Sequence, residues 1–350
     1  MKVLHISRTM GQGGAEKIVY QLCCDNEVSN VVASTGGVFV EHLKSKNIKN
    51  YFIPDIDKKN PILMIKTLLI LNDIINREKI DIIHSHHRMA AFYTSLLQFT
   101  HKKLRHIYTA HNIFFGKKIL MRFALRKCKI IACGKTVKHN LVNEYRIDNK
   151  DIEIIYNAVD IPEYRQINRS FDSGQRPCIG TIGRLSEQKG IDVFIKAIGK
   201  VKESYPRILG VIVGDGEDKE ILKNLTRNLE LEDNIKFLGY RKDVFQLIKS
   251  FDFVVLCSRW EGFPLTPIET FSMKKTIIVS NIMNNLEIVV DGYNGRSFER
   301  DSYLDLAKKM IVLLDSNYRN KLEKNAYLSY KEKYSYPQFI EKYKKIYRGI

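Results

Sequence analysis

The sequence contains no apolar run long enough to cross a membrane. Its longest apolar stretch, residues 62–75, is interrupted by Lys66, Asn72 and Asp73 and is shorter than the roughly 20 residues that a transmembrane helix needs. The first residues form a short strand-like run without the apolar segment and cleavage site of a signal peptide. We therefore expect a packed helix at 62–75 and a protein that is not exported.

Cysteine is scarce and is not arranged for metal or redox chemistry. No pair has the CxxC spacing of a zinc or dithiol site. We expect reduced, mostly buried thiols, as is usual in the cytosol. The six cysteines are Cys23, Cys24, Cys128, Cys133, Cys178 and Cys257.

Acidic residues are outnumbered by basic ones, because 57 Lys and Arg face 39 Asp and Glu, which gives a net charge of +18. Such an excess indicates an anionic partner, although a composition rich in lysine throughout would also produce it. The chain has no Cys/His finger and no aromatic pattern of an RNA-binding domain. We therefore expect no nucleic-acid partner, which leaves a phosphate-bearing small molecule or an acidic membrane surface.

Two series of short apolar segments alternate with helical patterns, which predicts two parallel sheets covered by helices. A polar segment at 168–177 suits a linker between them. We expect an α/β protein with one doubly wound domain over 1–165, a second over 175–335, and a final basic helix at 336–350 that packs back on the first. The expected strands are 3–6, 31–33, 81–84, 106–109, 129–132, 152–155, 178–182, 209–213, 235–238, 253–256 and 276–279.

A glycine-rich loop at 11–16 lies between the first expected strand and the first helix. Glycines at this position let a phosphate approach the backbone N–H groups of a helix N-terminus. Glu16 occupies the last glycine position of a GxGxxG fingerprint, so NAD binding is disfavoured. By itself the loop also fits a plain tight turn.

The second half carries more specific patterns. Arg184 and Lys189 lie in one loop after an expected strand, and two cations at that spacing can neutralise a diphosphate without a metal. Glu261 and Glu269 flank a loop whose backbone N–H groups, at Leu265 and Thr266, lead into a helix and form another anion site. Taken alone, these residues also fit an exposed turn, a helix-start carboxylate and a surface charge.

Together the motifs resemble glycosyltransferase family 4. In order they are GGAE at 13–16, TAHN at 109–112, YNAVD at 156–160, GR at 183–184 with KG at 189–190, GDG at 214–216, FLGY at 237–240, E-x7-E at 261 and 269, and DGYNG at 291–295. The resemblance covers nearly the whole chain and implies a GT-B fold, in which two Rossmann-like domains face each other across a cleft. After Glu269 the chain reads FSMKKT where the family has a glycine and a proline, so we expect strain at Lys274 or a different helix end.

The resemblance also implies roles for residues. Gly13 and Gly14 would approach the donor phosphates, Arg184 and Lys189 would clamp the diphosphate, Glu261 would face the donor sugar and Glu269 the ribose. Leu238 would line the base pocket, and His111 would sit beside the sugar. The full set implied is His111, Arg184, Lys189 and Glu261 as catalytic residues, with Gly13, Gly14, Gly183, Leu238, Tyr240, Phe263, Pro264, Leu265, Thr266 and Glu269 in donor binding.

The function implied is transfer of a sugar from a nucleoside diphosphate, with UDP favoured, to a hydroxyl of a lipid-linked or glycan acceptor in cell-surface polysaccharide biosynthesis. The resemblance implies retention of the anomeric configuration and no cofactor or metal, since Arg184 and Lys189 would stabilise the leaving diphosphate. Two alternatives stay open, namely a nucleotide-sugar 2-epimerase on the same fold and a sugar-nucleotide- or polyanion-binding module without turnover.

Two further clusters bear on partners. The histidines His84, His86 and His87 invite a metal interpretation, but neighbours on a strand point to opposite faces, so we prefer a strand end near the acceptor pocket. Cations and apolar residues are interleaved over 116–138, which resembles a basic amphipathic helix on anionic lipid; an ordinary helix with a solvated cationic face also fits. We favour peripheral contact with the inner face of the cell membrane.

Overall fold

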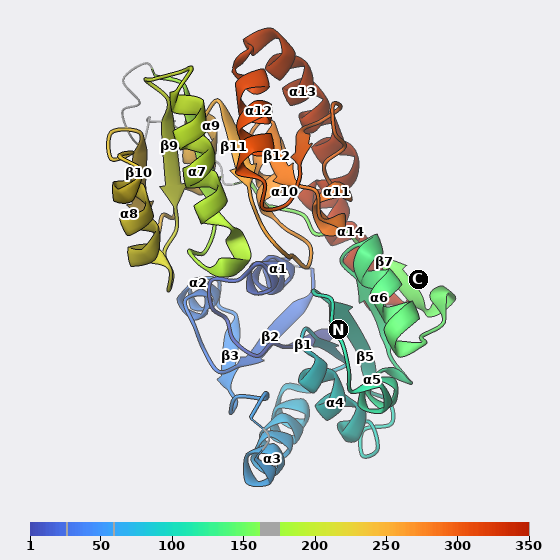
Figure 1. Ribbon diagram of the computed structural model, residues 1–350. Helices are drawn as coiled ribbons and strands as arrows, with labels where there is room; N and C mark the ends of the chain where they lie inside the picture. Colours follow the sequence, from blue (N-terminus) through green and yellow to red (C-terminus); the bar gives the residue numbers. More distant parts are fainter. Residues whose placement is uncertain (26, 59, 162–175, 350) are drawn as a thin grey trace. The chain divides into compact units, whose positions relative to one another are not determined.

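The computed structural model describes residues 1–25, 27–58, 60–161 and 176–349. These residues form two compact units, one made of Met1–Asn157 with Tyr336–Ile350 and the other of Ala158–Ser335 (Figure 1). The chain therefore leaves the first unit after Asn157 and returns to it for its last helix. Most of the linker expected at 168–177 lies outside the described residues.

The first unit contains a sheet of seven strands in the order β3-β2-β1-β4-β5-β6-β7. Every pairing in this sheet is parallel, and the connections between strands run through helices. All strands therefore end at the same edge of the sheet. The strands are β1 (Lys2–Ile6), β2 (Ser29–Ser34), β3 (Lys49–Phe52), β4 (Ile82–Ser85), β5 (Arg105–Ala110), β6 (Lys129–Ala132) and β7 (Ile152–Ile154).

Seven α-helices belong to the described part of this unit. They are α1 (Gly14–Cys23), α2 (Phe39–Ser45), α3 (Pro61–Glu78), α4 (Arg88–Leu97), α5 (Lys118–Leu125), α6 (Lys135–Tyr145) and α14 (Tyr336–Arg348). The last of these packs on the first unit, where Arg105 donates to the carbonyls of Ile346 at 2.8 Å and Tyr347 at 2.5 Å. Lys344 lies 2.8 Å from Glu27 and 3.3 Å from Asp25.

The second unit contains a parallel sheet of six strands in the order β10-β9-β8-β11-β12-β13. The strands are β8 (Cys178–Ile182), β9 (Leu209–Val213), β10 (Ile235–Gly239), β11 (Phe253–Leu256), β12 (Ile277–Ser280) and β13 (Arg296–Phe298). The described α-helices are α7 (Ile191–Lys202), α8 (Lys219–Asn228), α9 (Val244–Ser250), α10 (Thr266–Ser272), α11 (Met283–Leu286), α12 (Tyr303–Leu314) and α13 (Ser316–Ser329). The expectation of two doubly wound α/β sheets is confirmed.

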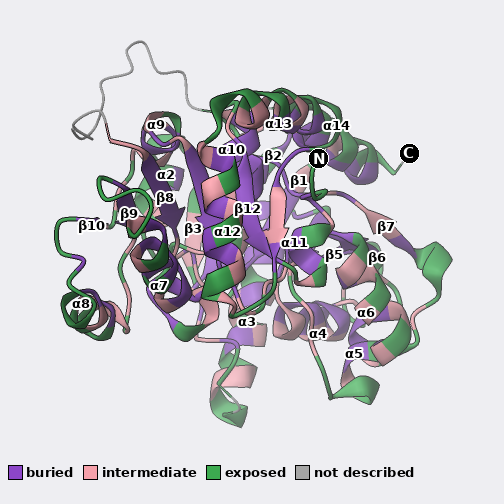
Figure 2. Ribbon diagram, turned by 45° about the horizontal axis from the view of Figure 1, so that its top comes forward, coloured by how far each residue is buried: buried purple, intermediate pink, exposed green. Residues whose placement is uncertain are grey.

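The central strands of both sheets are buried and the helices expose their outer faces (Figure 2). Strands β8, β9, β11 and β12 are buried at every position, as expected for parallel strands covered on both faces. The sequence patterns missed β3 and β13. Both are short edge strands with partly exposed residues, so neither carries a strong apolar signal.

The helix expected at 62–75 is α3, which begins after Asn60, whose side chain accepts from the backbone N–H groups of Ile62 and Leu63. Only one of its faces is packed. Ile62, Ile65 and Leu69 stay 76, 60 and 65% exposed, so the expectation of a packed helix was wrong for this stripe. Within the described residues, no helix combines the length and the apolar character that spanning a membrane requires.

Candidate active site

In the second unit, two loops that follow neighbouring parallel strands carry most of the candidate residues. Strand β8 pairs with β11, and the chain order reverses between them because β9 lies on one side of β8 and β12 on the other side of β11. Ligands of open parallel sheets bind at such a switch point, outside the carboxyl ends of the strands. The loop after β8 carries Arg184 and Lys189, and the loop after β11 carries Glu261.

Lys189 and Glu261 form an ion pair in this region. The Nζ atom of Lys189 lies 2.5 Å from Oε1 of Glu261, and the two side chains are only 19 and 8% exposed. Ser258 donates its hydroxyl to the same oxygen at 2.6 Å. The other carboxylate oxygen of Glu261 has no donor among the described residues, so it is free to accept from a ligand hydroxyl.

Contacts between the loop backbones hold this pair together. The backbone N–H of Arg259 donates to the carbonyl of Gln188 at 2.8 Å, and the amide of Gln188 donates to the carbonyl of Trp260 at 2.9 Å. The Arg259 guanidinium also donates to Asp192 and to Asp301. Sequence reasoning missed Arg259 and Ser258, because their role depends on partners that are distant in the chain.

Two glycines allow close backbone approaches here, Gly190 between the loops after β8 and β11 and Gly214 between the loops after β9 and β8. Gly190 has φ +60°, and a Cβ atom there would lie 2.4 Å from the carbonyl oxygen of Cys257. At Gly214, with φ +141°, a Cβ atom would lie 1.8 Å from the carbonyl oxygen of Gly183. A side chain at either position would clash with backbone, so both glycines are required by packing.

The described residues offer no ion-pair partner to Arg184, which is exposed beside Gly183. Leu238 is half-buried near the end of β10, and Tyr240 follows it with 50% exposure. The remaining donor-binding candidates surround the start of α10: Phe263 and Pro264 are buried, Leu265 is the N-cap residue, Thr266 is the first helical residue and Glu269 is 9% exposed.

Helix α10 ends without a glycine, and the expected strain falls on Lys274. This residue has φ +59°, a left-handed conformation that costs a residue with a Cβ roughly 1–2 kcal/mol. Its ammonium lies 5.0 Å from the centre of the Tyr327 ring, which offsets part of that cost. The strain lies beyond the donor-binding candidates.

In the first unit, the candidate residues again follow the central strands. Gly13 is the N-cap residue of α1 and Gly14 its first residue. His111 comes directly after β5, and its Nε2 lies 3.0 Å from Nδ1 of His86. His87 is separate from these two, since its Nδ1 accepts from the backbone N–H of Met89 and caps α4.

Three imidazoles lie close enough together to hold a metal ion, namely those of His5, His84 and His86, whose ligand atoms lie within 4.8 Å of one another. Their nitrogens are already hydrogen-bonded to neighbouring side chains, for example His84 to Tyr347 and to Thr109, each at 2.8 Å. The described residues of the cluster include no carboxylate that could neutralise a divalent charge. We therefore interpret it as a hydrogen-bonded network.

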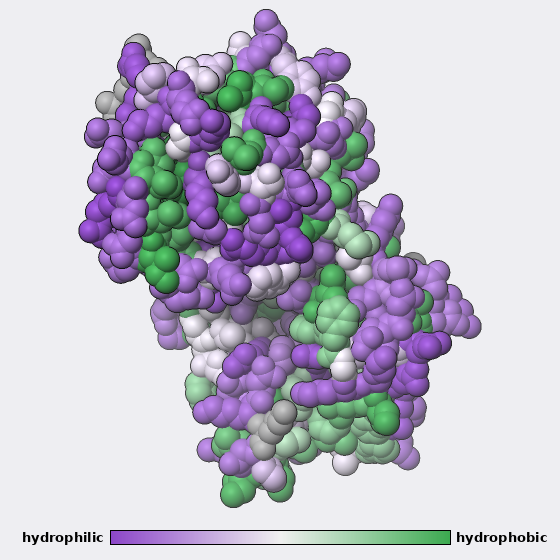
Figure 3. Space-filling view, viewed as in Figure 1, coloured by the Kyte–Doolittle hydropathy of each residue, from purple (hydrophilic) through white to green (hydrophobic). Residues whose placement is uncertain are grey.

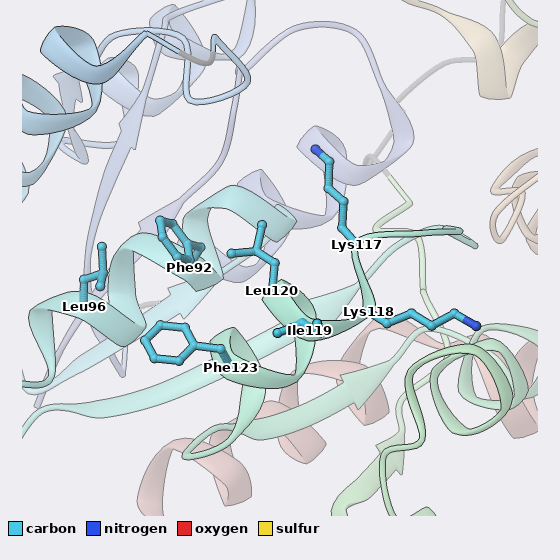
Figure 4. Close-up of a pocket in the computed structure, with 7 residues that line it drawn as sticks. All are labelled: Phe92, Leu96, Lys117, Lys118, Ile119, Leu120 and Phe123. Carbon is cyan, nitrogen blue, oxygen red and sulfur yellow. The ribbon is translucent and has the colours of Figure 1, made fainter.

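The expected basic amphipathic segment over 116–138 consists of α5, β6 and the start of α6, so only its first part is an amphipathic helix. A pocket of about 750 Å³ lies between α4 and α5. Phe92 and Leu96 project into it from one helix and Leu120 and Phe123 from the other, while the lysine ammonium groups point away (Figure 4). Its lining residues are Phe92, Leu96, Lys117, Lys118, Ile119, Leu120 and Phe123.

Exposed apolar side chains gather on the lower part of the view in Figure 3. Ile119 is 85% exposed. Several cations of the segment have structural contacts, among them Lys118, whose Nζ lies 3.5 Å from Glu144. Arg122 donates to the carbonyl of Tyr145 at 2.9 Å, and Arg126 lies 4.5 Å from the centre of the Phe123 ring. Lys117 and Lys118 are exposed.

Two family descriptions match almost the whole chain. Residues 12–163 match "Glycosyltransferase Family 4" and residues 161–329 match "Glycosyl transferases group 1". The first covers β2 to β7 and α1 to α6, with His111, and the second covers both loops of the Lys189–Glu261 pair.

Relatives and solved structures agree with these matches. The chain is 25% identical over 342 residues to the UDP-Gal:alpha-D-GlcNAc-diphosphoundecaprenol alpha-1,3-galactosyltransferase of Escherichia coli, covering 91% of this chain and 88% of the relative. It is 26% identical over 321 residues to the uncharacterized glycosyltransferase MJ1178 of Methanocaldococcus jannaschii, covering 89 and 87%. The crystal structure of Anabaena HepE in complex with UDP and glucose superposes with a TM-score of 0.86 at 20% identity, covering 100% of both chains. The chain therefore belongs to the glycosyltransferases of the GT-B fold, with a family 4 segment followed by a group 1 segment.

Proposed function

We propose that this enzyme transfers a hexosyl group from a UDP-sugar to a hydroxyl of a lipid-diphosphate-linked sugar, with retention of the anomeric configuration. The observation that carries the proposal is the Lys189–Glu261 pair beside the exposed Arg184 at the switch point of the second sheet. A donor diphosphate placed there meets an ammonium and a guanidinium, and its sugar meets the unpaired oxygen of Glu261.

The charges suit the departure of a diphosphate. As the bond between the anomeric carbon and the phosphate oxygen breaks, negative charge accumulates on the leaving group. A cation that is already in place stabilises this charge most at the transition state. Lys189 is held in place by Glu261 and, through Gly190, by the loop that contains Cys257. We propose that Arg184 and Lys189 supply the stabilisation without a divalent metal, and that the departing phosphate accepts the proton of the acceptor hydroxyl.

Two observations favour a lipid-linked acceptor in cell-surface polysaccharide synthesis. The Escherichia coli relative is named for an acceptor that carries diphosphoundecaprenol. In addition, the apolar pocket between α4 and α5, bordered by Lys117 and Lys118, combines a surface for hydrocarbon with nearby cations. We propose that this surface contacts anionic membrane at the cytoplasmic face, because interleaved cations and exposed apolar side chains bind such surfaces.

The full chain tests the reaction directly. It is incubated with a panel of nucleotide sugars and with either an undecaprenyl-diphosphate-linked sugar or the same sugar without the lipid diphosphate. We expect UDP release and a glycosylated product with one UDP-sugar, and faster transfer to the lipid-linked acceptor. Nuclear magnetic resonance of the product should show the donor's anomeric configuration, and EDTA should leave the rate unchanged.

Three results would count against separate parts of the proposal. A product with inverted anomeric configuration would contradict the retaining mechanism. Activity that EDTA abolishes and manganese restores would contradict metal-independent catalysis. Equal rates with both acceptors would contradict the proposal that the acceptor is lipid-linked, but would still support glycosyl transfer.

A further inference from the structure

A chain of side-chain contacts runs through the interior of the first unit to His111. Nε2 of His5 lies 3.1 Å from Oδ1 of Asn30, and Nδ1 of His5 lies 3.0 Å from Nε2 of His86. Nδ1 of His86 lies 3.0 Å from Nε2 of His111. The four residues come from β2, β1, the end of β4 and the end of β5, so four adjacent strands of the sheet build the chain.

Asn30 determines the direction of the first hydrogen bond. Its Nδ2 lies 2.9 Å from the carbonyl oxygen of Val28 and 3.3 Å from that of Cys23. Carbonyl oxygens only accept hydrogen bonds, so the amide NH2 must face them and Oδ1 must face His5. His5 therefore donates from Nε2, and the opposite orientation would place oxygen against oxygen in the buried interior.

Each imidazole in the chain carries one proton. Burial lowers the pKa of His5 to about 4 and that of His111 to about 4, and it lowers the pKa of His86 well below its usual value. A neutral imidazole has one N–H donor and one acceptor nitrogen. With His5 protonated on Nε2, its Nδ1 accepts from Nε2 of His86. Nδ1 of His86 in turn accepts from Nε2 of His111.

The chain ends on an unused acceptor. Nδ1 of His111 is buried, and no group among the described residues forms a hydrogen bond with it. A buried acceptor without a donor is destabilising, and a bound donor would remove that cost. His111 also follows β5 at the edge where parallel strands present ligand sites.

We propose that Asn30, His5 and His86 are positioning residues that hold His111 protonated on Nε2, so that its Nδ1 accepts a hydrogen bond from a hydroxyl or amide N–H of the sugar substrate. This rests on the proposed function, because the ligand is the sugar that the enzyme transfers or extends. The arrangement selects for a donor group at that position of the sugar. A fluorine, a ketone oxygen or a carboxylate there has no proton to give and faces a lone pair.

The first test needs no substrate. Side-chain nitrogen chemical shifts of the full-length protein, labelled with ¹⁵N, distinguish protonated from bare imidazole nitrogens. We expect the wild-type protein at pH 7 to show His111 with a protonated Nε2 and a bare Nδ1. In Asn30→Leu, which removes the terminal acceptor, His111 should become a mixture of both tautomers.

The matched control is His106→Gln. His106 is also buried in the same sheet, but its hydrogen bond goes to Ser85, which is not part of the hydrogen-bonded series from Asn30 to His111. This variant should leave the His111 signals unchanged. A proton on Nδ1 of wild-type His111 would overturn the proposal. An unchanged His111 tautomer in Asn30→Leu would overturn it as well. The wild-type measurement decides even where Asn30→Leu does not fold.

The second test uses sugar donors and acceptors in which one hydroxyl at a time is replaced by fluorine. For one hydroxyl, the wild-type enzyme should lose about tenfold in kcat/KM, the worth of one hydrogen bond. In Asn30→Leu, the ratio of kcat/KM for the hydroxyl substrate to kcat/KM for its fluorine analogue should fall toward one, while UDP affinity is unchanged. In His106→Gln, this ratio should stay at the wild-type value.

The two hypotheses can fail separately. If no nucleotide sugar supports transfer while the wild-type tautomer is as expected, the proposed function fails and the hydrogen-bond chain stands. If transfer occurs but no hydroxyl is discriminated, or if Asn30→Leu discriminates as the wild type does, the role of the chain is overturned.

Discussion

The Nζ atom of Lys189 lies 2.5 Å from Oε1 of Glu261, and this contact joins two loops separated by 72 residues. The pair is buried enough that neither charge is fully solvated. Removing one partner therefore leaves the other uncompensated, and the consequences for catalysis and stability need to be measured separately.

Lys189→Ala should lower kcat about 100-fold or more while weakening UDP-sugar binding much less, because in the proposed mechanism its charge acts mainly on the leaving diphosphate at the transition state. Steady-state kinetics and calorimetric binding of UDP separate the two effects. The control is Lys200→Ala, which breaks the exposed Lys200–Glu203 pair of the same unit and should leave kcat unchanged. A rise in KM with kcat intact would show that Lys189 serves ground-state binding only.

The buried histidines should make the protein sensitive to acid below pH 6.5. Burial lowers the pKa of His5 and His111 to about 4 and that of His106 to about 3. As the pH falls through 6.5 the unfolded chain takes up protons first, so stability that is present above pH 6.5 is lost toward pH 4. At pH 5 each group accounts for about 2 kcal/mol.

The free energy of unfolding, measured with urea at pH 7 and at pH 5, checks this prediction. Carboxylates with ordinary pKa values contribute little to the change in stability over this pH range. His106→Gln removes one of the six histidines whose pKa burial lowers, the others being His5, His84, His86, His87 and His111, and should reduce the loss by about 2 kcal/mol, the share of one group. Equal stability of the wild-type protein at both pH values would contradict the interpretation.

The left-handed conformation of Lys274 should be relieved by glycine. Lys274→Gly and Lys274→Ala both remove the contact with Tyr327, so their difference reports the backbone alone. We expect the glycine variant to be about 1 kcal/mol more stable, because only alanine keeps the unfavourable Cβ atom. Thermal unfolding measures the difference, and an alanine variant of equal or higher Tm would show that Lys274 is unstrained.

Docking on anionic membrane should depend on the two exposed lysines of the pocket rim, Lys117 and Lys118, of which Lys118 also lies 3.5 Å from Glu144. The paired replacement Lys117→Gln with Lys118→Gln should weaken co-sedimentation with phosphatidylglycerol vesicles by roughly tenfold or more, since each lysine near such a surface is worth about 1 kcal/mol. Added salt should weaken binding of the wild-type protein. Arg122 and Arg126 are poor targets, because their contacts with Tyr145 and Phe123 are structural.

The control pair is Lys44→Gln with Lys46→Gln on the same unit, where both side chains are exposed on or next to α2. If the protein docks through α5, this control double variant should bind vesicles as strongly as the wild-type protein does. An equal loss in both double variants would mean that the general positive charge, and not this surface, binds the lipid.

Several features could be predicted from local sequence alone. Buried parallel strands are nearly continuous apolar runs, so β8, β9 and β11 were recognisable within one or two residues. Glycine before a helix and lysine or glutamate in fixed motifs mark loops that follow strands, so Lys189 and Glu261 could be identified as candidates. The edge strand β3 could not, because its residues 49–52 alternate little and stay partly exposed.

The sequence by itself determined the alternation of strands and helices, the two-sheet organisation and the residue types in the loops after β8 and β11, because these depend on patterns within a few residues. Only the tertiary structure decided which side chains meet. Arg259 joins the two loops, Asn30 orients His5, and α4 and α5 enclose an apolar pocket, and in each case the partners come from separate elements. Hydrogen bonds and ion pairs act over about 3 Å in space. The separation of two residues along the sequence does not show whether they come that close in the folded protein.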